Sequence, residues 1–382
     1  MRRITTLVLS ILFLFITNTS SAQTGPGGVG NSSNLEAWMD AARLTGLSNN
    51  DPVSSWTDFS GNNNHATQAT GVRQPLYLTN QVNSQPSIRF DGMNDFFNFN
   101  SHLQNNALTF FSVYQTSVPN GRTILNTQNH YIFHQNQNIR TNYINPGSQI
   151  AVLSPASTSY VIVEASTNSD SLSGTVNLKS ADRSTTGSRT QLRGNLNSTI
   201  GTFNSSLYFN GNITEIIVYN QNLNSARKNI ISNYLGAKYN STTPVNLYSY
   251  RTSYNNDVLG IGQEADGSHT VARGLDSLEI SNPTTLNNGD YLLIGNDGAD
   301  FSTSASVPGG IVERWNRVWR VDKTGTPGNI DMEFFLGSSG FAAPTNYVIL
   351  TEIVDGDFSN GGTSVLSSVP SFNAANNSII FN

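Results

Sequence analysis

Short runs of β-branched and aromatic residues, separated by turn residues, recur along most of the chain. The clearest runs are residues 108–114, 160–165 and 213–219. Runs of this length and composition, bounded by turn residues, are typical of β-strands. The pattern therefore predicts a chain that is mainly β.

Asn-Gly pairs separate several of these runs, and Asn is abundant throughout the sequence. Asn-Gly favours tight hairpin turns because both central residues of such a turn need a positive φ. Asn210-Gly211 lies between the apolar run 207–209 and the run 213–219, so we expect a hairpin there. We interpret the Asn content mainly as turn chemistry.

One segment, from Ser225 to Tyr239, has the period of an amphipathic helix. Asn224 or Ser225 can cap it, and its apolar face comprises Ala226, Ile230, Ile231, Tyr234 and Leu235. Arg227, Lys228 and Asn229 face away. The pattern predicts a helix that packs by one face across one end of a β-sandwich.

The first 22 residues have the pattern of a secretory signal peptide. Arg2 and Arg3 precede an apolar stretch at 7–16, and small residues follow at 20–22. The stretch is shorter than the roughly 20 residues that cross a bilayer. We therefore expect cleavage before Gln23, a mature chain without a transmembrane segment, and a protein that is secreted or held at the cell surface.

The remaining chain is long for one domain, so we expect two of unequal size. A polar stretch closed by a proline, residues 241–244, is the predicted boundary. It separates a first domain at 31–241 from a smaller β-domain at 245–382, and Gly-rich residues 25–30 are expected to be a flexible lead-in. The last five residues resemble part of a strand, which favours a fragment of a longer surface protein.

Charge and cysteine content narrow the function further. Charged residues make up 12% of the chain, about half the usual share, and the formal net charge is −5. No basic cluster suggests nucleic-acid binding. The sequence has no cysteine, which excludes thiol catalysis, Cys-ligated metals and disulfides.

Five phrases, in order along the chain, resemble the bacterial laminin-G-like (concanavalin A-like) jelly-roll domain. They are residues 35–41, 55–62, 85–95, 209–220 and 234–239. The resemblance implies an antiparallel β-sandwich with one C-terminal helix, whose rim loops often carry calcium or glycan sites. Residues 256–262 and 314–321 resemble an uncharacterised β-module that follows such domains in surface proteins of gliding Gram-negative bacteria.

Calcium is the cofactor that the sequence favours. Calcium takes six to eight oxygen ligands, and Asp91, Asn94 and Asp95 offer three side-chain oxygens in one short loop. Asp58 belongs to another phrase of the resemblance. The alternative is that Asp91-Gly92 is a turn in which the carboxylates accept backbone N–H bonds.

Motifs for catalysis are missing from the sequence. Glycosidases need two carboxyl groups about 5–10 Å apart, and on this fold a Glu-x-Asp-x-x-Glu phrase supplies them. No such phrase occurs, because Glu164 and Glu215 each stand alone in their strands. His130 and His134 lie in a predicted strand, too far apart to share a metal.

Tyr131 and Tyr143 lie among Asn and Gln residues and are the candidate sugar-stacking residues, although they could instead point into the core. Trp56 and Phe90 are expected in the core, and Trp315 and Trp319 are expected on one strand face in the second core. We expect a non-catalytic binding or adhesion module that recognises a polysaccharide or a cell-surface glycan or protein through rim loops. The alternatives are a glycoside hydrolase or polysaccharide lyase, and a structural segment of a surface protein.

Overall fold

The computed structural model describes residues 24–382 except for a set of internal gaps, which are 100–106, 117, 119–121, 128–129, 136–137, 144–148, 154–156, 168–170, 177–178, 185–197, 204, 276–277, 338–346, 354–356, 361 and 367–369. In this part of the chain strands dominate and the one α-helix is α1 (Ser225–Lys238). Short 3-10 turns form η1 (Pro26–Gly28), η2 (Ala41–Arg43) and η3 (Gly71–Arg73). The mainly β prediction is confirmed.

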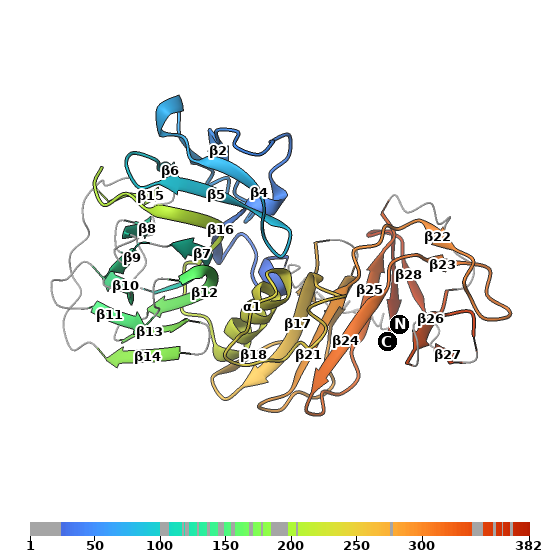
Figure 1. Ribbon diagram of the computed structural model, residues 1–382. Helices are drawn as coiled ribbons and strands as arrows, with labels where there is room; N and C mark the ends of the chain where they lie inside the picture. The colour runs from blue at the N-terminus through green and yellow to red at the C-terminus, as the bar shows by residue number, and fades with distance from the viewer. Residues whose placement is uncertain are drawn as a thin grey trace, which may run out of the picture.

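The first module is a sandwich of two antiparallel sheets, which we call the inner sheet and the outer sheet (Figure 1). The inner sheet has the order β14 (Lys179–Ser184), β13 (Ser171–Val176), β12 (Ser157–Thr167), β7 (Leu108–Thr116), β16 (Asn210–Tyr219), β5 (Gln85–Asp91) and β4 (Leu76–Val82), with β1 (Leu35–Asp40) paired to the second half of β16. The outer sheet has the order β11 (Gln149–Leu153), β10 (Asn138–Tyr143), β9 (His130–Gln135), β8 (Arg122–Asn126), β15 (Ser198–Ile200), β6 (Phe97–Phe99), β3 (Ala66–Thr67) and β2 (Ser55–Trp56).

Side chains that point inward at alternate strand positions fill the space between these two sheets. Trp56 and Phe90 are fully buried there, as the sequence predicted, together with Phe97, Phe110, Tyr114, Phe209 and Ile216. Their neighbours along the inner sheet, such as Phe111 and Ile217, point to the opposite face and are buried as well. The inner sheet is therefore apolar on both faces, which requires a second covering layer.

The second module also consists of two main sheets, here called proximal and distal. The proximal sheet has the order β18 (Gly267–His269), β17 (Asn256–Glu264), β21 (Tyr291–Asn296) and β24 (Trp319–Thr324), and the distal sheet has the order β19 (Ala272–Arg273), β20 (Leu278–Ser281), β25 (Asp331–Phe335), β29 (Ser378–Phe381) and β28 (Ser371–Asn373). Two further strand pairs are β22 (Thr303–Ser304) with β23 (Arg314–Trp315), and β26 (Ile349–Glu352) with β27 (Thr363–Leu366). The prediction of a second, smaller β-sandwich-like domain is confirmed.

Helix α1 lies between the two modules (Figure 1). It begins at the predicted residue and ends one residue before the predicted Tyr239. The predicted cap is confirmed, since Asn224 Oδ1 accepts a hydrogen bond from Arg227 N at 3.0 Å. The expectation of one packing face was wrong. Side chains from the inner sheet, α1 and the proximal sheet (Ile217, Ile230, Tyr234, Val258 and Leu293 among them) form one buried cluster. The helix thus covers the second face of the inner sheet.

The polar face of α1 is also engaged. Lys228 Nζ lies 3.4 Å from Glu164 Oε1 on β12, and Asn229 Nδ2 donates to Tyr291 Oη on β21 at 2.9 Å. These residues do not face open solvent, because each module supplies polar partners beside the apolar contact.

The segment Gly25–Gly30 was predicted to be a flexible lead-in, and this prediction was wrong. Pro26, Gly27 and Gly28 are buried in η1, and Val29 is packed in the cluster around α1. The carbonyl oxygen of Gly28 lies 3.0 Å from His269 Nε2, and Tyr219 Oη donates to Val29 O at 2.8 Å. The glycines permit this close packing, since Gly28 has a φ of +76° and a Cβ there would lie 2.6 Å from Ala272 Cβ.

Two further local predictions were wrong. Asn210-Gly211 begins β16 instead of forming a hairpin turn, because Gly211 lies against β7, where a Cβ would approach Gln115 O to 2.2 Å. Trp315 and Trp319 lie on separate strands, β23 and β24. Their rings are 6.0 Å apart and pack near Phe334, so the expected aromatic core is nevertheless present.

Candidate functional site

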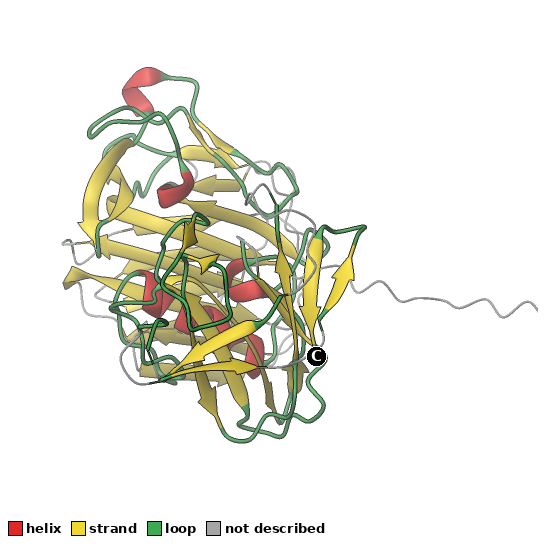
Figure 2. Ribbon diagram, turned by 90° about the vertical axis from the view of Figure 1, so that its right-hand side faces the viewer, coloured by secondary structure: helices red, strands yellow, loops and turns green. Residues whose placement is uncertain are grey.

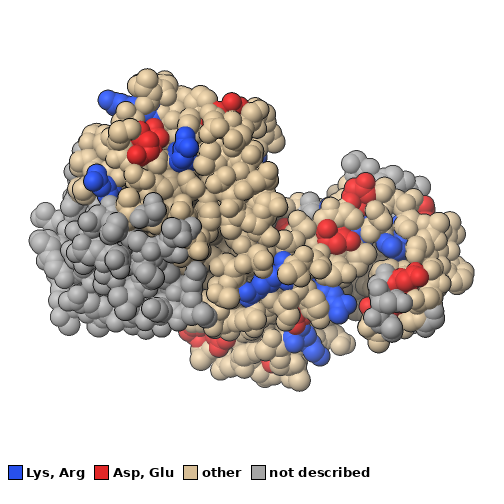
Figure 3. Space-filling view, in the orientation of Figure 1, with Lys and Arg blue, Asp and Glu red and all other residues tan. Residues whose placement is uncertain are grey.

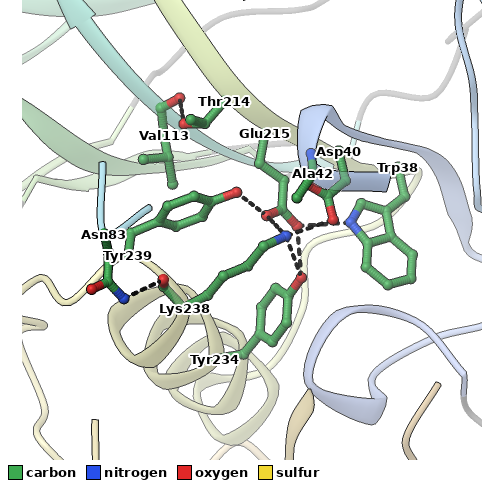
Figure 4. Close-up of polar contacts among 10 residues, drawn as sticks. All are labelled: Trp38, Asp40, Ala42, Asn83, Val113, Thr214, Glu215, Tyr234, Lys238 and Tyr239. Carbon is green, nitrogen blue, oxygen red and sulfur yellow. Dashed lines mark hydrogen bonds and ion pairs between the residues drawn. The ribbon is translucent and has the colours of Figure 1, made fainter. Parts of the chain in front are cut away.

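Two carboxylates meet between α1 and the inner sheet, although they lie far apart in the sequence (Figure 4). Asp40 ends β1, and the antiparallel register places it opposite Glu215 on β16. Lys238, in the last turn of α1, reaches between them: its Nζ lies 2.5 Å from Asp40 Oδ2 and 2.8 Å from Glu215 Oε2. We call these three residues, with Trp38, Tyr234 and Tyr239, the buried ionic cluster.

Both carboxylate oxygens of Glu215 accept hydrogen bonds within this cluster. Trp38 Nε1 and Tyr234 Oη donate to Oε1 at 2.7 and 3.0 Å. Lys238 Nζ and Tyr239 Oη donate to Oε2 at 2.8 and 2.7 Å. A buried carboxylate is tolerated when its charge is paired and its lone pairs are hydrogen-bonded, and Glu215 meets both conditions.

The electrostatics of the cluster favour a charged Lys238 that is paired with the two carboxyl groups. Burial raises the pKa of Asp40, and the charge of Lys238 opposes that rise. Burial alone would lower the pKa of Lys238, but Asp40 and Glu215 outweigh it and the pKa is raised. Lys238 therefore stays protonated between the carboxylates.

This arrangement does not have the properties of a glycosidase pair. Such a pair needs one protonated carboxyl group and access for a glycosidic oxygen. Both carboxyl groups here accept from the same ammonium group, and both side chains are almost fully buried. We therefore assign the cluster a structural role, holding α1 against the inner sheet. The available sequence signal was the presence of Asp40 and Glu215 in runs that are mainly apolar, 35–40 and 213–219.

The loop with the predicted calcium ligands is organised by hydrogen bonds to its own backbone. Asp91 Oδ1 accepts from the backbone N of Met93, Asn94 and Asp95 at 2.8, 3.0 and 3.2 Å. Asp95 Oδ2 accepts from Asp91 N at 3.0 Å. Burial and the neighbouring Asp91 raise the pKa of Asp95 to about 6. These contacts match the alternative interpretation, in which Asp91-Gly92 is a turn and the carboxylates accept backbone N–H bonds.

Asp58 is occupied in a different place. Its Oδ1 accepts from Trp38 N and Ser60 N, both at 2.9 Å, and its Oδ2 accepts from Ser60 Oγ and Asn64 N, both at 2.8 Å. Within the described residues, no group of three or more His, Asp or Glu side chains is placed to hold a metal ion. Asp58 and the Asp91 loop thus have separate hydrogen-bond partners, and calcium binding by Asp91, Asn94, Asp95 or Asp58 stays a prediction.

A row of neutral polar residues crosses the outer sheet on the side away from the core. Backbone pairing joins Ser55 to Thr67, Thr67 to Asn98, Asn98 to Thr199, and Thr199 to Asn126. The residues next to them along the strands lie in the core: Trp56, Ala66, Phe97, Phe99, Ile200 and Leu125. Because successive side chains alternate between faces, these five point outward, and we call them the polar ladder.

The register also places the two predicted sugar-stacking positions. Position 131 on β9 pairs with Asn126 and so continues the row of the ladder, followed by positions 142 and 149. Position 143 pairs with position 130, one step out of this row. The side chains of Tyr131 and Tyr143 lie outside what the structure describes, so their role stays a prediction.

Access to the polar ladder differs along its length. Ser55 and Thr67 are exposed and Asn98 is half-buried, whereas Thr199 and Asn126 are buried. Thr199 Oγ1 donates to Thr202 O at 2.6 Å. The open end of the ladder therefore lies over β2, β3 and β6.

Comparisons with known proteins give one family match and several distant structural likenesses. Residues 227–382 match the sequence model of a family described as "Domain of unknown function (DUF8202)". No curated protein matches the chain. The family match begins inside α1, before the proline-closed stretch 241–244, in keeping with the packing of α1 on the proximal sheet.

Three of the similar solved structures are complexes with a small molecule. Domain 4 of an extracellular GH43 arabinanase from Geobacillus stearothermophilus, in complex with arabinotriose, has a TM-score of 0.38 and 12% identity, covering 52% of this chain and 96% of that one. The ligand-binding domain of botulinum neurotoxin serotype D, in complex with N-acetylneuraminic acid, has a TM-score of 0.37 and 11% identity, covering 81% and 72%. A Trypanosoma rangeli sialidase in complex with the inhibitor DANA has a TM-score of 0.33 and 15% identity, covering 51% and 32%.

Proposed function

We propose that this protein is an exported, non-catalytic binding module that recognises carbohydrate, and that the polar ladder is its contact face. The observation that carries the proposal is the composition of the ladder. Its five described members are hydroxyl or amide residues, and none is charged or apolar. Such groups both donate and accept hydrogen bonds, as the hydroxyl groups of a neutral sugar require.

The layer order supports the choice of this face. The inner sheet is covered on one side by the outer sheet and on the other by α1, so its faces are buried. The proximal sheet is similarly enclosed between α1 and the distal sheet. In the first module, the outward face of the outer sheet is exposed at Ser55 and Thr67, and this part of the face is left for a ligand.

Sparse charge on the surface supports a neutral ligand. On the face shown in Figure 3, Lys, Arg, Asp and Glu side chains are scattered, and most of the described surface is uncharged. Among the described residues, no helix is both long and apolar enough to cross a membrane.

A glycan array probed with the chain from residue 23 to 382 tests the proposal. We expect binding to one or more neutral polysaccharides, and we expect Thr67→Ala combined with Asn98→Ala to weaken it by about thirtyfold, since each of the two lost hydrogen bonds contributes about 1 kcal/mol. Thr303→Ala is the matched control, because Thr303 is an exposed strand threonine of the second module. Binding that survives the double substitution would refute the ladder as the contact face, and retention of no glycan would refute the function.

A further inference from the structure

Three loops that adjoin strands of the polar ladder converge at one end of the sandwich. Residues 68–75 follow β3, residues 92–96 precede β6, and residues 201–209 follow β15. Phe96 N donates to Arg73 O at 3.4 Å, and the rings of Phe96 and Tyr208 are 6.3 Å apart. The η3 turn of the first loop projects from the sandwich away from the second module (Figures 1 and 2).

Each of these loops holds a large aliphatic side chain in solvent. Val72 is 80% exposed, Met93 is 72% exposed and Leu207 is 45% exposed. With the half-buried Phe96 and Tyr208 they form what we call the apolar lip. Single exposed apolar residues are ordinary, but a group of them on adjoining loops marks an interaction surface.

Two exposed arginines lie beside the lip. Arg73 follows Val72 in the chain and is exposed. Arg122 is exposed too, and it lies beside Leu207, because Thr123 N donates to Leu207 O at 3.2 Å. Two carboxylates lie near Met93: Asp95 is buried, and the half-buried Asp91 at the end of β5 accepts three backbone N–H bonds.

We propose that the apolar lip docks on an anionic lipid membrane. The aliphatic tips would enter the interface between headgroups and acyl chains, and the two arginines would lie at the level of the lipid phosphates. Aliphatic groups beside basic residues bind such surfaces through burial and charge together. If the proposed function holds, docking by the lip would turn the adjoining ladder towards sugars presented on that membrane.

Co-sedimentation of the chain from 23 to 382 with vesicles tests this proposal. The vesicles are phosphatidylcholine alone and an equal mixture of phosphatidylcholine with phosphatidylglycerol, and neither carries sugar. We expect binding to the mixture and weaker binding to phosphatidylcholine. Val72→Asp with Met93→Asp should lower the affinity for the mixture by tenfold or more, because two apolar side chains no longer leave water.

The second module offers a matched control pair. Val312 and Ile353 are 88% and 84% exposed, so Val312→Asp with Ile353→Asp adds the same charge without touching the lip and should leave vesicle binding unchanged. Arg73→Gln with Arg122→Gln should remove the preference for the anionic vesicles. The proposal is overturned if the unmodified chain stays in the supernatant, or if the lip and control pairs behave alike. Because the vesicles carry no sugar, neither result depends on the glycan array.

Discussion

At the scale of single residues, the position of Lys238 is the most consequential. Its ammonium group lies between two carboxylates that are almost fully shielded from water. Removing a buried partner costs more than the pair contributes, because the remaining charge is left without compensation. In this cluster two negative groups would be left facing each other.

We therefore predict that Lys238→Met destabilises the protein by about 3–5 kcal/mol. The free energy of unfolding, measured in urea, reports the effect. Lys323→Met is the control, because Lys323 is an exposed strand lysine and its loss should change stability by less than about 0.5 kcal/mol. Equal effects of the two substitutions would show that the cluster does not hold α1.

His269 makes stability depend on pH. Burial, aided by Arg227, lowers its pKa to about 3, while its Nε2 stays 3.0 Å from Gly28 O. Since the unfolded histidine has a pKa near 6.5, the unfolded state binds more protons below that pH, and stability is lost as the pH falls from about 6.5 towards 3.

We predict that His269 lowers the free energy of unfolding by about 2 kcal/mol as the pH falls from 7 to 5. Asp95, with a pKa raised to about 6, acts in the opposite direction. The measurement is therefore a difference: the pH-dependent loss should be about 2 kcal/mol smaller in His269→Gln than in the unmodified chain. An identical loss in both would contradict the prediction.

At the scale of elements, the N-terminal segment 24–30 shows how glycine permits close packing. Gly28 and Gly46 both have a positive φ, of +76° and +75°. A Cβ at Gly28 would lie 2.6 Å from Ala272 Cβ, whereas a Cβ at Gly46 would meet nothing within 4 Å. The two positions therefore separate steric crowding from backbone strain.

We predict that Gly28→Ala destabilises the protein by about 2–4 kcal/mol, since left-handed strain and overpacking add. Gly46→Ala should cost only the strain, about 1–2 kcal/mol. Thermal or urea unfolding of the two variants checks this. Equal losses of stability in the two variants would mean that the segment 24–30 shifts to make room for the added methyl group.

The sequence predicted those elements that are determined by the pattern of neighbouring residues. The period of residues 225–239 and the branched runs at 108–114 and 213–219 specify a helix and strands by themselves. The reason for Gly211 is a carbonyl on β7, and the reason for Gly28 is a methyl group on β19. Such causes come from distant strands, so local turn rules misassigned both segments. The pairing of Asp40 with Glu215 and the polar ladder depend in the same way on strand register.

At the scale of the whole molecule, α1 joins two modules that a domain boundary at 241–244 would separate. The cluster around it contains Leu35 and Ile217 from the inner sheet and Val258 and Leu293 from the proximal sheet. Cutting the chain at the boundary would expose apolar surface on both pieces. Each module is therefore stabilised by the other.

We predict that residues 23–382 unfold in a single cooperative transition. Residues 23–241 alone should unfold at a lower temperature and bind hydrophobic dyes, because the proximal side of α1 is then uncovered. Scanning calorimetry of the whole chain and of the piece distinguishes the cases. Two transitions in the whole chain, one matching that of the isolated piece, would show independent modules.

The contact between Gly28 and His269 spans 241 positions of the chain. A ribosome adding about 5–20 residues per second needs roughly 12–48 s to make that stretch. For most of this interval the nascent amino-terminal segment lacks its partners, because Tyr219 follows Val29 by 190 positions and α1 and His269 come later still. The apolar side of α1 is also uncovered until the last third of the polypeptide is made. Synthesis thus produces an intermediate with exposed apolar surface, which a chaperone would have to cover. Mutations that slow elongation between these positions should lower the yield of folded protein without altering its final stability.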